Sequence, residues 1–147
     1  MKKAGKLVTG LLGLAMAVTT ILPAMAAPSA VYDKKVELPP GMLWTFGGEV
    51  TYNGDKYAGG KALCESVYPS EGVDYYNTIR YRITEYYGTV ISVDPYVKIT
   101  EGAGYRSVAI KRAYDYLGHI YFQFQGNTVY PANAIVSFDG LAMPILP

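Results

Sequence analysis

The sequence predicts an all-β fold, a small antiparallel β-sandwich or a partly open barrel of about seven to eight strands. Apolar and polar residues alternate with a period of two along much of the chain, as they do in half-buried strands. Turn signals rich in Gly, Asn, Asp and Pro recur about every eight to twelve residues. All 15 tyrosines lie after residue 26, and tyrosine favours strands. No stretch shows the periodicity of an amphipathic helix of useful length.

The first 26 residues are predicted to be a cleaved secretory signal peptide. A cationic head (residues 1–6) precedes an apolar run (residues 7–22), and Ala24-Met25-Ala26 forms a small-x-small cleavage site. The alternative is an uncleaved membrane anchor. Gly and Pro interrupt the run, and its strongly apolar part is shorter than the about twenty residues that a spanning helix needs. We therefore expect cleavage after Ala26 and a secreted, extracellular protein.

Residues 27–41 are predicted to form a linker, and residues 42–147 a single β domain. The linker contains Pro28, Pro39 and Pro40, and proline lacks the N–H group that regular strand pairing uses. Export would leave 121 residues, which is one domain by length. A chain of this size can bury about two thirds of the surface that it exposes when unfolded.

The domain is expected to open with a β-hairpin. Residues 43–52 form the first predicted strand, and the Asn53-Gly54 pair after it is typical of a type I′ turn. Residues 55–58 would return beside this strand.

Two glycines, Gly59 and Gly60, are expected to end that return strand, and residues 61–67 fit either a short strand or a turn of helix. The clearest strand covers residues 77–86, where large apolar residues alternate with polar ones. Further strands are expected over residues 89–93, 96–100, 105–111, 118–125 and 134–138, each bounded by turn residues.

The charge of the chain argues against nucleic acid as a partner. Lys2, Lys3 and Lys6 would leave with the signal peptide, so the mature chain would carry 10 Lys and Arg against 12 Asp and Glu, a formal charge of −2. Nucleic-acid binding depends on a basic patch. We therefore expect no nucleic acid, and partners held by shape, hydrogen bonds and aromatic contact.

No set of residues predicts catalysis, a metal site or a cofactor. A nucleophile needs a base within reach, yet no motif surrounds Cys64, and the single histidine, His119, lies within a predicted strand. The acidic residues are dispersed, unlike zinc or calcium ligands. A carboxylate pair assembled by the fold stays open, although so small a domain rarely has a deep cleft. We expect a non-enzymatic protein without metal or cofactor.

Cys64 leaves three states open. As the only cysteine it cannot form an intramolecular disulfide. It can be buried as a small hydrophobe, stay free, or pair with a second chain, which would make the protein a homodimer.

Trp44, the only tryptophan, is expected to be structural. It lies at the start of the first predicted strand, beside Leu43 and near Phe46. We therefore expect it to be largely buried and to anchor that strand. Replacement of a core tryptophan by alanine costs about 3–5 kcal/mol.

Tyrosines and arginines supply the candidate binding residues. Aromatic rings stack on sugar faces, and guanidinium groups pair with phosphate or carboxylate, so such a surface suits a cell-wall glycan or a phosphorylated envelope lipid. The alternative is a solvated sheet face with cross-strand Tyr–Arg pairs. The candidates are Arg80, Arg82, Tyr75, Tyr76, Tyr86 and Tyr87.

Five sequence elements between residues 44 and 124 resemble, in their order, the lactococcin-like family of small secreted bacteriocins. The chain departs from that family in lacking histidines near the Thr-Val element, in having Cys64 and in its longer tail. The elements are Trp44-Thr45-Phe46-Gly47, Tyr75-Tyr76, Thr89-Val90, Ala103-Gly104 with Ser107 and Ala109, and Tyr121-Phe122-Gln123-Phe124.

The resemblance implies a non-enzymatic β-sandwich toxin that acts at the cell envelope of related bacteria. Its partner would be an envelope component or a cell-wall precursor, and a separate immunity protein would protect the producer. This bacteriocin-like antagonist is the first hypothesis, and the alternative is a secreted binding module for cell-wall glycan or a host surface. A small hydrolase or hydrolase inhibitor ranks last because no acid–base set is visible.

Overall fold

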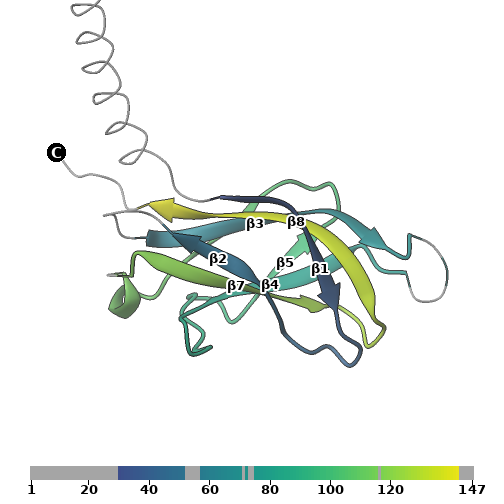
Figure 1. Cartoon of the computed structure of the whole chain (residues 1–147), viewed down its shortest axis with the longest axis horizontal. Helices are drawn as coiled ribbons and strands as arrows, with labels where there is room; N and C mark the ends of the chain where they lie inside the picture. Colours follow the sequence, from purple (N-terminus) through teal and green to yellow (C-terminus); the bar gives the residue numbers. More distant parts are fainter. Residues whose placement is uncertain (1–29, 52–56, 71, 73–74, 116, 143–147) are drawn as a thin grey trace, which may run out of the picture.

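The computed structural model describes residues 30–51, 57–70, 72, 75–115 and 117–142, and these residues form two packed four-stranded antiparallel sheets (Figure 1). The predicted signal peptide lies outside the described residues. The all-β prediction is confirmed, since the described residues contain eight strands, one 3-10 turn and no α-helix. The elements are β1 (Val31–Leu38), β2 (Thr45–Thr51), β3 (Tyr57–Tyr68), β4 (Thr78–Thr84), β5 (Val97–Thr100), β6 (Arg106–Ala109), η1 (Arg112–Tyr114), β7 (His119–Gly126) and β8 (Ala132–Ala142).

The strand order is that of a jelly roll. One sheet runs β1–β8–β3–β6 and the other runs β2–β7–β4–β5. Consecutive strands lie in opposite sheets at every step except from β4 to β5, so two Greek keys interlock around one core. None of the described helical segments is long and apolar enough to cross a membrane.

The predicted hairpin between the first two strands of the domain is wrong. β2 pairs with β7, whereas β3 pairs with β8 and β6 in the other sheet. The turn residues Asn53 and Gly54 lie outside the described residues. Val50 of β2 and Tyr57 of β3 are both fully buried, so each strand turns an apolar side to the shared core from its own sheet. Burial of both apolar sides outweighs the local turn signal.

The predicted break at Gly59 and Gly60 is also wrong, because β3 passes through both glycines without interruption. A Cβ atom on Gly60 would lie 2.7 Å from Ile83 Cδ1 and 2.7 Å from Phe122 Cζ, both of the opposite sheet. Glycine is therefore required here by the close approach of the two sheets and does not mark a strand end. Residues 61–67, left open between strand and helix, belong to the same strand.

The predicted linker is wrong for residues 31–38, which form the edge strand β1 and pair with β8. Val36 and Leu38 point into the core, and the charged residues between them and before them face solvent, as an edge strand allows. Pro39 and Pro40 directly follow the strand and do not interrupt it, and Pro28 lies outside the described residues. The described domain therefore begins about ten residues earlier than expected.

Two further strand predictions need correction in their extent. Residues 89–93 make only isolated bridges, Thr84 to Val90 and Ser92 to Ile110. The last strand, predicted over residues 134–138, is the eleven-residue strand β8. β8 is an inner strand that pairs with β1 on one side and with β3 on the other, and these two pairings make it longer than predicted.

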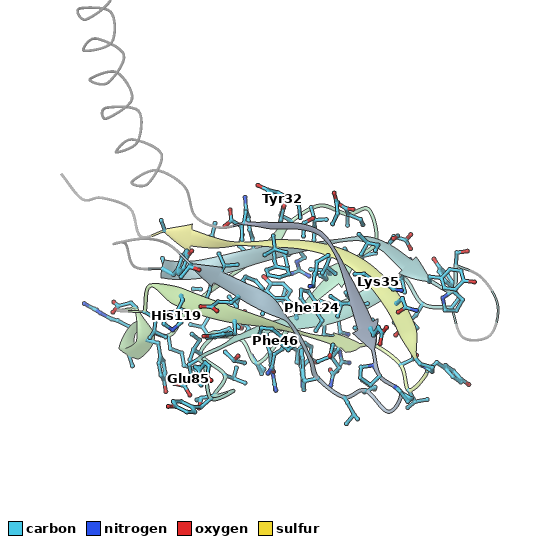
Figure 2. The ribbon with its side chains drawn as sticks, in the orientation of Figure 1. Tyr32, Lys35, Phe46, Glu85, His119 and Phe124 are labelled. Atoms are coloured by element: carbon cyan, nitrogen blue, oxygen red, sulfur yellow. The ribbon has the colours of Figure 1, made fainter. Side chains whose placement is uncertain are left out.

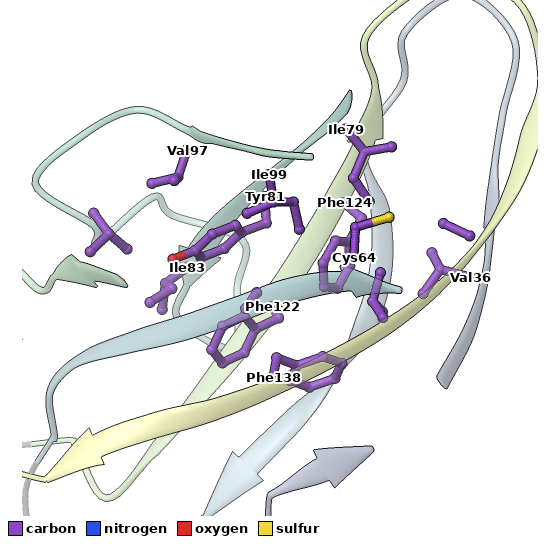
Figure 3. Packing of buried hydrophobic residues seen from close by; sticks show 14 of the residues in the cluster. Val36, Cys64, Ile79, Tyr81, Ile83, Val97, Ile99, Phe122, Phe124 and Phe138 are labelled. Atoms are coloured by element: carbon purple, nitrogen blue, oxygen red, sulfur yellow. The ribbon is translucent and has the colours of Figure 1, made fainter. Parts of the chain in front are cut away.

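The core is an aromatic cluster that joins the two sheets (Figure 3). Phe138 of β8 lies 4.7 Å from Phe122 and 5.6 Å from Phe124 of β7, measured between ring centroids. Tyr81 of β4 packs against Phe122 at 5.9 Å, and its hydroxyl donates a 2.6 Å hydrogen bond to the carbonyl oxygen of Arg106 in the opposite sheet. Burial of each such side chain stabilises the fold by about 1.5–3 kcal/mol.

Candidate functional site

The outer face of the β2–β7–β4–β5 sheet carries the predicted arginines. Along β4, Ile79, Tyr81 and Ile83 are fully buried, whereas Arg80 and Arg82 are half-buried on the opposite side. The alternation that placed the two arginines on one face is thus confirmed. A strand lies on each side of these arginines, because β4 is an inner strand between β7 and β5.

Side-chain amides in β7 and just after it accept hydrogen bonds from both guanidinium groups. Arg82 is the cross-strand neighbour of Gln123, and its Nε donates to Gln123 Oε1 at 2.8 Å. Arg80 is opposite Gln125 and donates from Nη1 to Gln125 Oε1 at 3.4 Å and from Nε to Asn127 Oδ1 at 3.2 Å. These contacts fix the positions of the two groups on the sheet.

Aromatic rings cover the same guanidinium groups. The guanidinium carbon of Arg80 lies 4.5 Å from the ring centroid of Tyr96, just before β5. That of Arg82 lies 4.2 Å from the ring of Trp44, just before β2. Each is within the range of a cation–π contact. These residues share the outer surface of the sheet with neighbouring aromatic and amide side chains. We call this surface the amide–aromatic face, and it consists of Trp44, Phe46, Arg80, Arg82, Tyr96, Tyr121, Gln123 and Gln125.

The sequence predicts a largely buried Trp44 that anchors the first strand, but this side chain is not part of the buried core. Trp44 is half-buried and lies outside the buried cluster, on the outer surface of its sheet. Further along β2, Gly47 faces the interior, and Phe124 occupies the space there, 2.3 Å from where a Cβ of Gly47 would lie. The indole of Trp44 instead packs on Arg82.

The positive charge on this face has no carboxylate partner within the described residues. All three side-chain acceptors of Arg80 and Arg82 are neutral amide oxygens. Lys98 of β5 is the other cross-strand neighbour of Arg80 and adds a third cation. Burial lowers the pKa of Arg82, because a guanidinium withdrawn from water without a counterion is less favourable in its charged form.

A shallow groove of about 360 Å³ adjoins Arg82 on this face. Phe46 and Tyr121 form one wall, with ring centroids 6.1 Å apart, and Tyr86 meets Tyr121 edge-on at 5.8 Å. Gln123, which holds Arg82, also lines the groove. Phe46 is 61% exposed, so a large apolar ring faces solvent here. The groove is lined by Phe46, Thr84, Glu85, Tyr86, Gly88, Tyr121 and Gln123.

The groove carries negative charge at the end that lies away from the arginines. Glu85 lines it, and Glu49 of β2 is the cross-strand neighbour of Tyr121. Burial first, and then the charge of Glu49, raise the pKa of Tyr121. Figure 2 shows Glu85 and His119 at one end of the sandwich. The face is therefore electrically polar, with cations at one end and carboxylates at the other.

The structure brings together four of the six predicted binding residues. Arg80 and Arg82 lie on the amide–aromatic face, and Tyr86 and Tyr87, in edge-on contact at 5.1 Å, project beside its groove. Tyr75 is 41% exposed but precedes β4, so the length of that strand, about 20 Å, separates it from Tyr86.

Tyr76 is the clear error among the predicted binding residues. It is buried in the core, and its hydroxyl donates to the carbonyl oxygen of Tyr130 at 3.3 Å. Burial also raises its pKa. Its neighbour Tyr75 faces outward because adjacent residues of an extended chain point to opposite sides.

Six residues of this face were not among the binding residues predicted from the sequence: Trp44, Phe46, Tyr96, Tyr121, Gln123 and Gln125. The alternation of Tyr121-Phe122-Gln123-Phe124 does place Tyr121 and Gln123 on one side of a strand. What the sequence could not supply is the register, which sets Phe46 opposite Gln123 and Arg82 opposite the same glutamine.

The single cysteine and the single histidine do not form a catalytic pair. Cys64 is buried in the core from β3, where its Sγ contacts the carbonyl oxygen of Ser66 at 3.6 Å (Figure 3). His119 begins β7 on the outer face of the other sheet and meets Tyr121 edge-on at 5.7 Å. Within the described residues, no cluster of His, Cys, Asp and Glu could hold a metal ion.

Two of the five elements that carry the lactococcin-like resemblance, the first and the last, lie on this face. Thr45 pairs with Phe124 and Phe46 with Gln123, so the first and last elements of the resemblance are neighbouring strands. Comparison of the chain with models of protein families, with curated proteins and with solved structures found no match. The function proposed below therefore rests on the geometry of the amide–aromatic face.

Proposed function

We propose that this protein is a secreted, non-enzymatic binding module that recognises glycan of the bacterial cell envelope through its amide–aromatic face. The observation that carries the proposal is the groove in which the rings of Phe46, Tyr86 and Tyr121 stand beside the amide of Gln123. Rings offer flat apolar surfaces to the C–H face of a sugar, while amides donate and accept hydrogen bonds with its hydroxyls and guanidinium groups donate them.

The shape of the site supports binding along a chain. The groove is open and shallow, and it lies on a sheet surface bordered by further aromatic residues. An extended polymer can contact such a surface over several sugar units, whereas a small free ligand would require a deeper pocket. Wall glycan is an extended polymer that a secreted protein meets outside the membrane.

A sedimentation assay tests the proposal with a matched pair of variants. Tyr86 in the groove and Tyr68 on the other sheet are both 70% exposed. Tyr86→Ala should weaken co-sedimentation of the mature chain with isolated bacterial cell walls, and Tyr68→Ala should leave it unchanged. A parent chain that stays in the supernatant, or a Tyr86→Ala variant that sediments as the parent does, would contradict the proposal.

Export is a part of the proposal that can be tested separately. The Ala24-Met25-Ala26 triplet should direct cleavage after Ala26. Mass spectrometry of culture supernatant should then find a chain that begins at Ala27. A full-length species confined to the membrane fraction would contradict secretion.

A second candidate function is antagonism of related bacteria, as the family resemblance implies. The observation that favours it is that the resembling elements supply Trp44, Phe46, Tyr121 and Gln123 to one face. Under this candidate the envelope ligand is a wall precursor or component, and the producer carries an immunity protein. A spot assay of the mature protein on related strains should show zones of inhibition, and their absence from every strain whose walls bind the protein would leave the binding module alone.

A further inference from the structure

We propose that the glycan is anionic, and that its phosphate or carboxylate groups lie over Arg80 and Arg82. This inference rests on the proposed function and specifies the chemistry of its ligand. The two arginines are two residues apart on the same side of β4, so their Cα atoms are about 6.6 Å apart. With Lys98 beside Arg80 they form a short row of cations across β4 and β5.

The row lacks the counterions that folded proteins usually give to partly buried cations. Within the described residues neither Arg80 nor Arg82 contacts a carboxylate, and their acceptors are amide oxygens. Withdrawal of a cation from water is unfavourable unless an anion compensates for it. An anionic ligand would supply that compensation, which a neutral sugar cannot.

The guanidinium groups are also held ready for an anion. Each group is held between an aromatic ring, Tyr96 for Arg80 and Trp44 for Arg82, and its hydrogen bonds to side-chain amides in and just after β7. Among the described residues, the amides accept from only Nε of Arg82 and from Nε and Nη1 of Arg80, so terminal N–H groups of both remain to donate. A planar guanidinium with free donors binds phosphate or carboxylate in a fork.

The cations and the sugar groove form one continuous site. Gln123 accepts the hydrogen bond of Arg82 and also lines the groove with Phe46 and Tyr121. A sugar ring in the groove would therefore place an acidic group of its own or of the next unit over Arg82. Glu49 and Glu85 at the far end would repel that group, which orients the chain with its acidic group toward β5.

Matched probes separate charge from sugar contact. We suggest measuring binding of the mature chain to a uronic acid oligosaccharide and to the same oligosaccharide with its carboxyl groups reduced to alcohols. Poly(glycerol phosphate) tests phosphate as the source of the anion. The parent should bind at least one anionic probe at least about tenfold more tightly than the reduced oligosaccharide, and the difference should shrink as salt is raised.

Variants then test whether the arginines cause the tighter binding of the anionic probe. Arg82→Gln and Arg80→Gln should each lower affinity for the anionic probe by a several-fold larger factor than affinity for the reduced one, and Arg82→Lys should recover part of the loss. Arg112→Gln, an exposed arginine in η1 outside this face, serves as the control for net charge. Thermal unfolding of each variant verifies that it is folded before its affinity is compared.

The outcomes distinguish this inference from the proposed function. Equal affinity of the parent for the charged and reduced oligosaccharides, together with no preference for poly(glycerol phosphate), overturns the anionic ligand. If the reduced oligosaccharide still binds and Tyr86→Ala weakens it, the glycan module stands without the inference. The inference is also overturned if Arg82→Gln and Arg112→Gln weaken binding of the anionic probe equally, because net charge would then account for the effect.

Discussion

The guanidinium carbon of Arg82 lies 4.2 Å from the ring centroid of Trp44, although 38 positions separate the two residues in the chain. The contact joins β4 to the start of β2 across the intervening strand β7. Arg82 reaches this position because Gln123 of β7 accepts its Nε–H at 2.8 Å. One side chain thus links three strands of the sheet on its outer surface.

We expect Arg82 and Trp44 to be energetically coupled. A double-mutant cycle with Arg82→Ala and Trp44→Ala should give a coupling free energy of about 0.5–2 kcal/mol in urea unfolding, because the cation–π contact is partly shielded from water. Arg82→Lys retains the charge but not the planar stack and should recover only part of the coupling. Strict additivity of the two single variants would mean that the contact contributes nothing to stability.

Trp44→Ala itself should cost less than the about 3–5 kcal/mol of a core replacement, because the ring lies on the sheet surface. The fluorescence maximum of the folded protein should shift toward that of tryptophan in water when Arg82 is replaced by alanine, since the replacement uncovers the indole. An unchanged spectrum would show that Arg82 does not shield the ring in solution.

Gly60→Ala should destabilise the fold by about 1–3 kcal/mol, the usual cost of overpacking a core. The added methyl group would lie 2.7 Å from both Ile83 Cδ1 and Phe122 Cζ. Ser66→Ala, on the same strand, should change the free energy of unfolding by less than about 0.5 kcal/mol. Urea unfolding of the two variants and the parent measures the difference, and a neutral Gly60→Ala would show that the sheets are less closely packed there.

The carboxyl group of Glu65 should make stability depend on pH. The hydrogen bond that protonated Glu65 donates to the Asp33 carboxylate, followed by burial and by the charge of Asp33, raises the pKa of Glu65, while the hydrogen bond from Ser137 Oγ at 3.4 Å opposes the shift. The folded state therefore holds this proton more tightly than the unfolded state. Protonated Glu65 therefore stabilises the folded state. This stabilisation is fully present below about pH 4.5 and is lost as the pH rises through the raised pKa of Glu65.

Glu65→Gln should accordingly raise the melting temperature at pH 7, where two neighbouring carboxylates repel each other in the parent. The advantage should disappear near pH 4. Glu37→Gln, which removes an exposed carboxylate from β1, is the control for net charge. Melting curves from pH 4 to pH 8 measure the effect, and parallel curves for Glu65→Gln and the parent would contradict the interaction.

Cys64 should react slowly with alkylating reagents in the folded protein. It is 1% exposed, and burial, followed by the charge of Glu101, raises the pKa of its thiol to about 12, so little thiolate is present at pH 8. Mass spectrometry should detect rapid modification by iodoacetamide in urea and little without it. Equal rates in the two conditions would mean that the thiol is accessible in the native state.

The local pattern of the sequence determined the fold class and several of the strands. The alternation of Ile79, Tyr81 and Ile83 with Arg80 and Arg82 established both the strand β4 and its two faces. The same period-two rule placed Tyr121 and Gln123 together on β7. Such patterns are readable in one sequence because a strand exposes alternate side chains to opposite surroundings whichever partner it pairs with.

Only the tertiary structure decided which strands are neighbours and which side of each strand is the core. The Asn53-Gly54 signal favoured a hairpin, but β2 and β3 lie in opposite sheets because each buries its apolar side against the common core. The same contacts made an edge strand of residues 31–38, moved Trp44 to the surface and took Tyr76 into the interior. Strand pairing and register depend on contacts between residues far apart in the chain, which no local pattern contains.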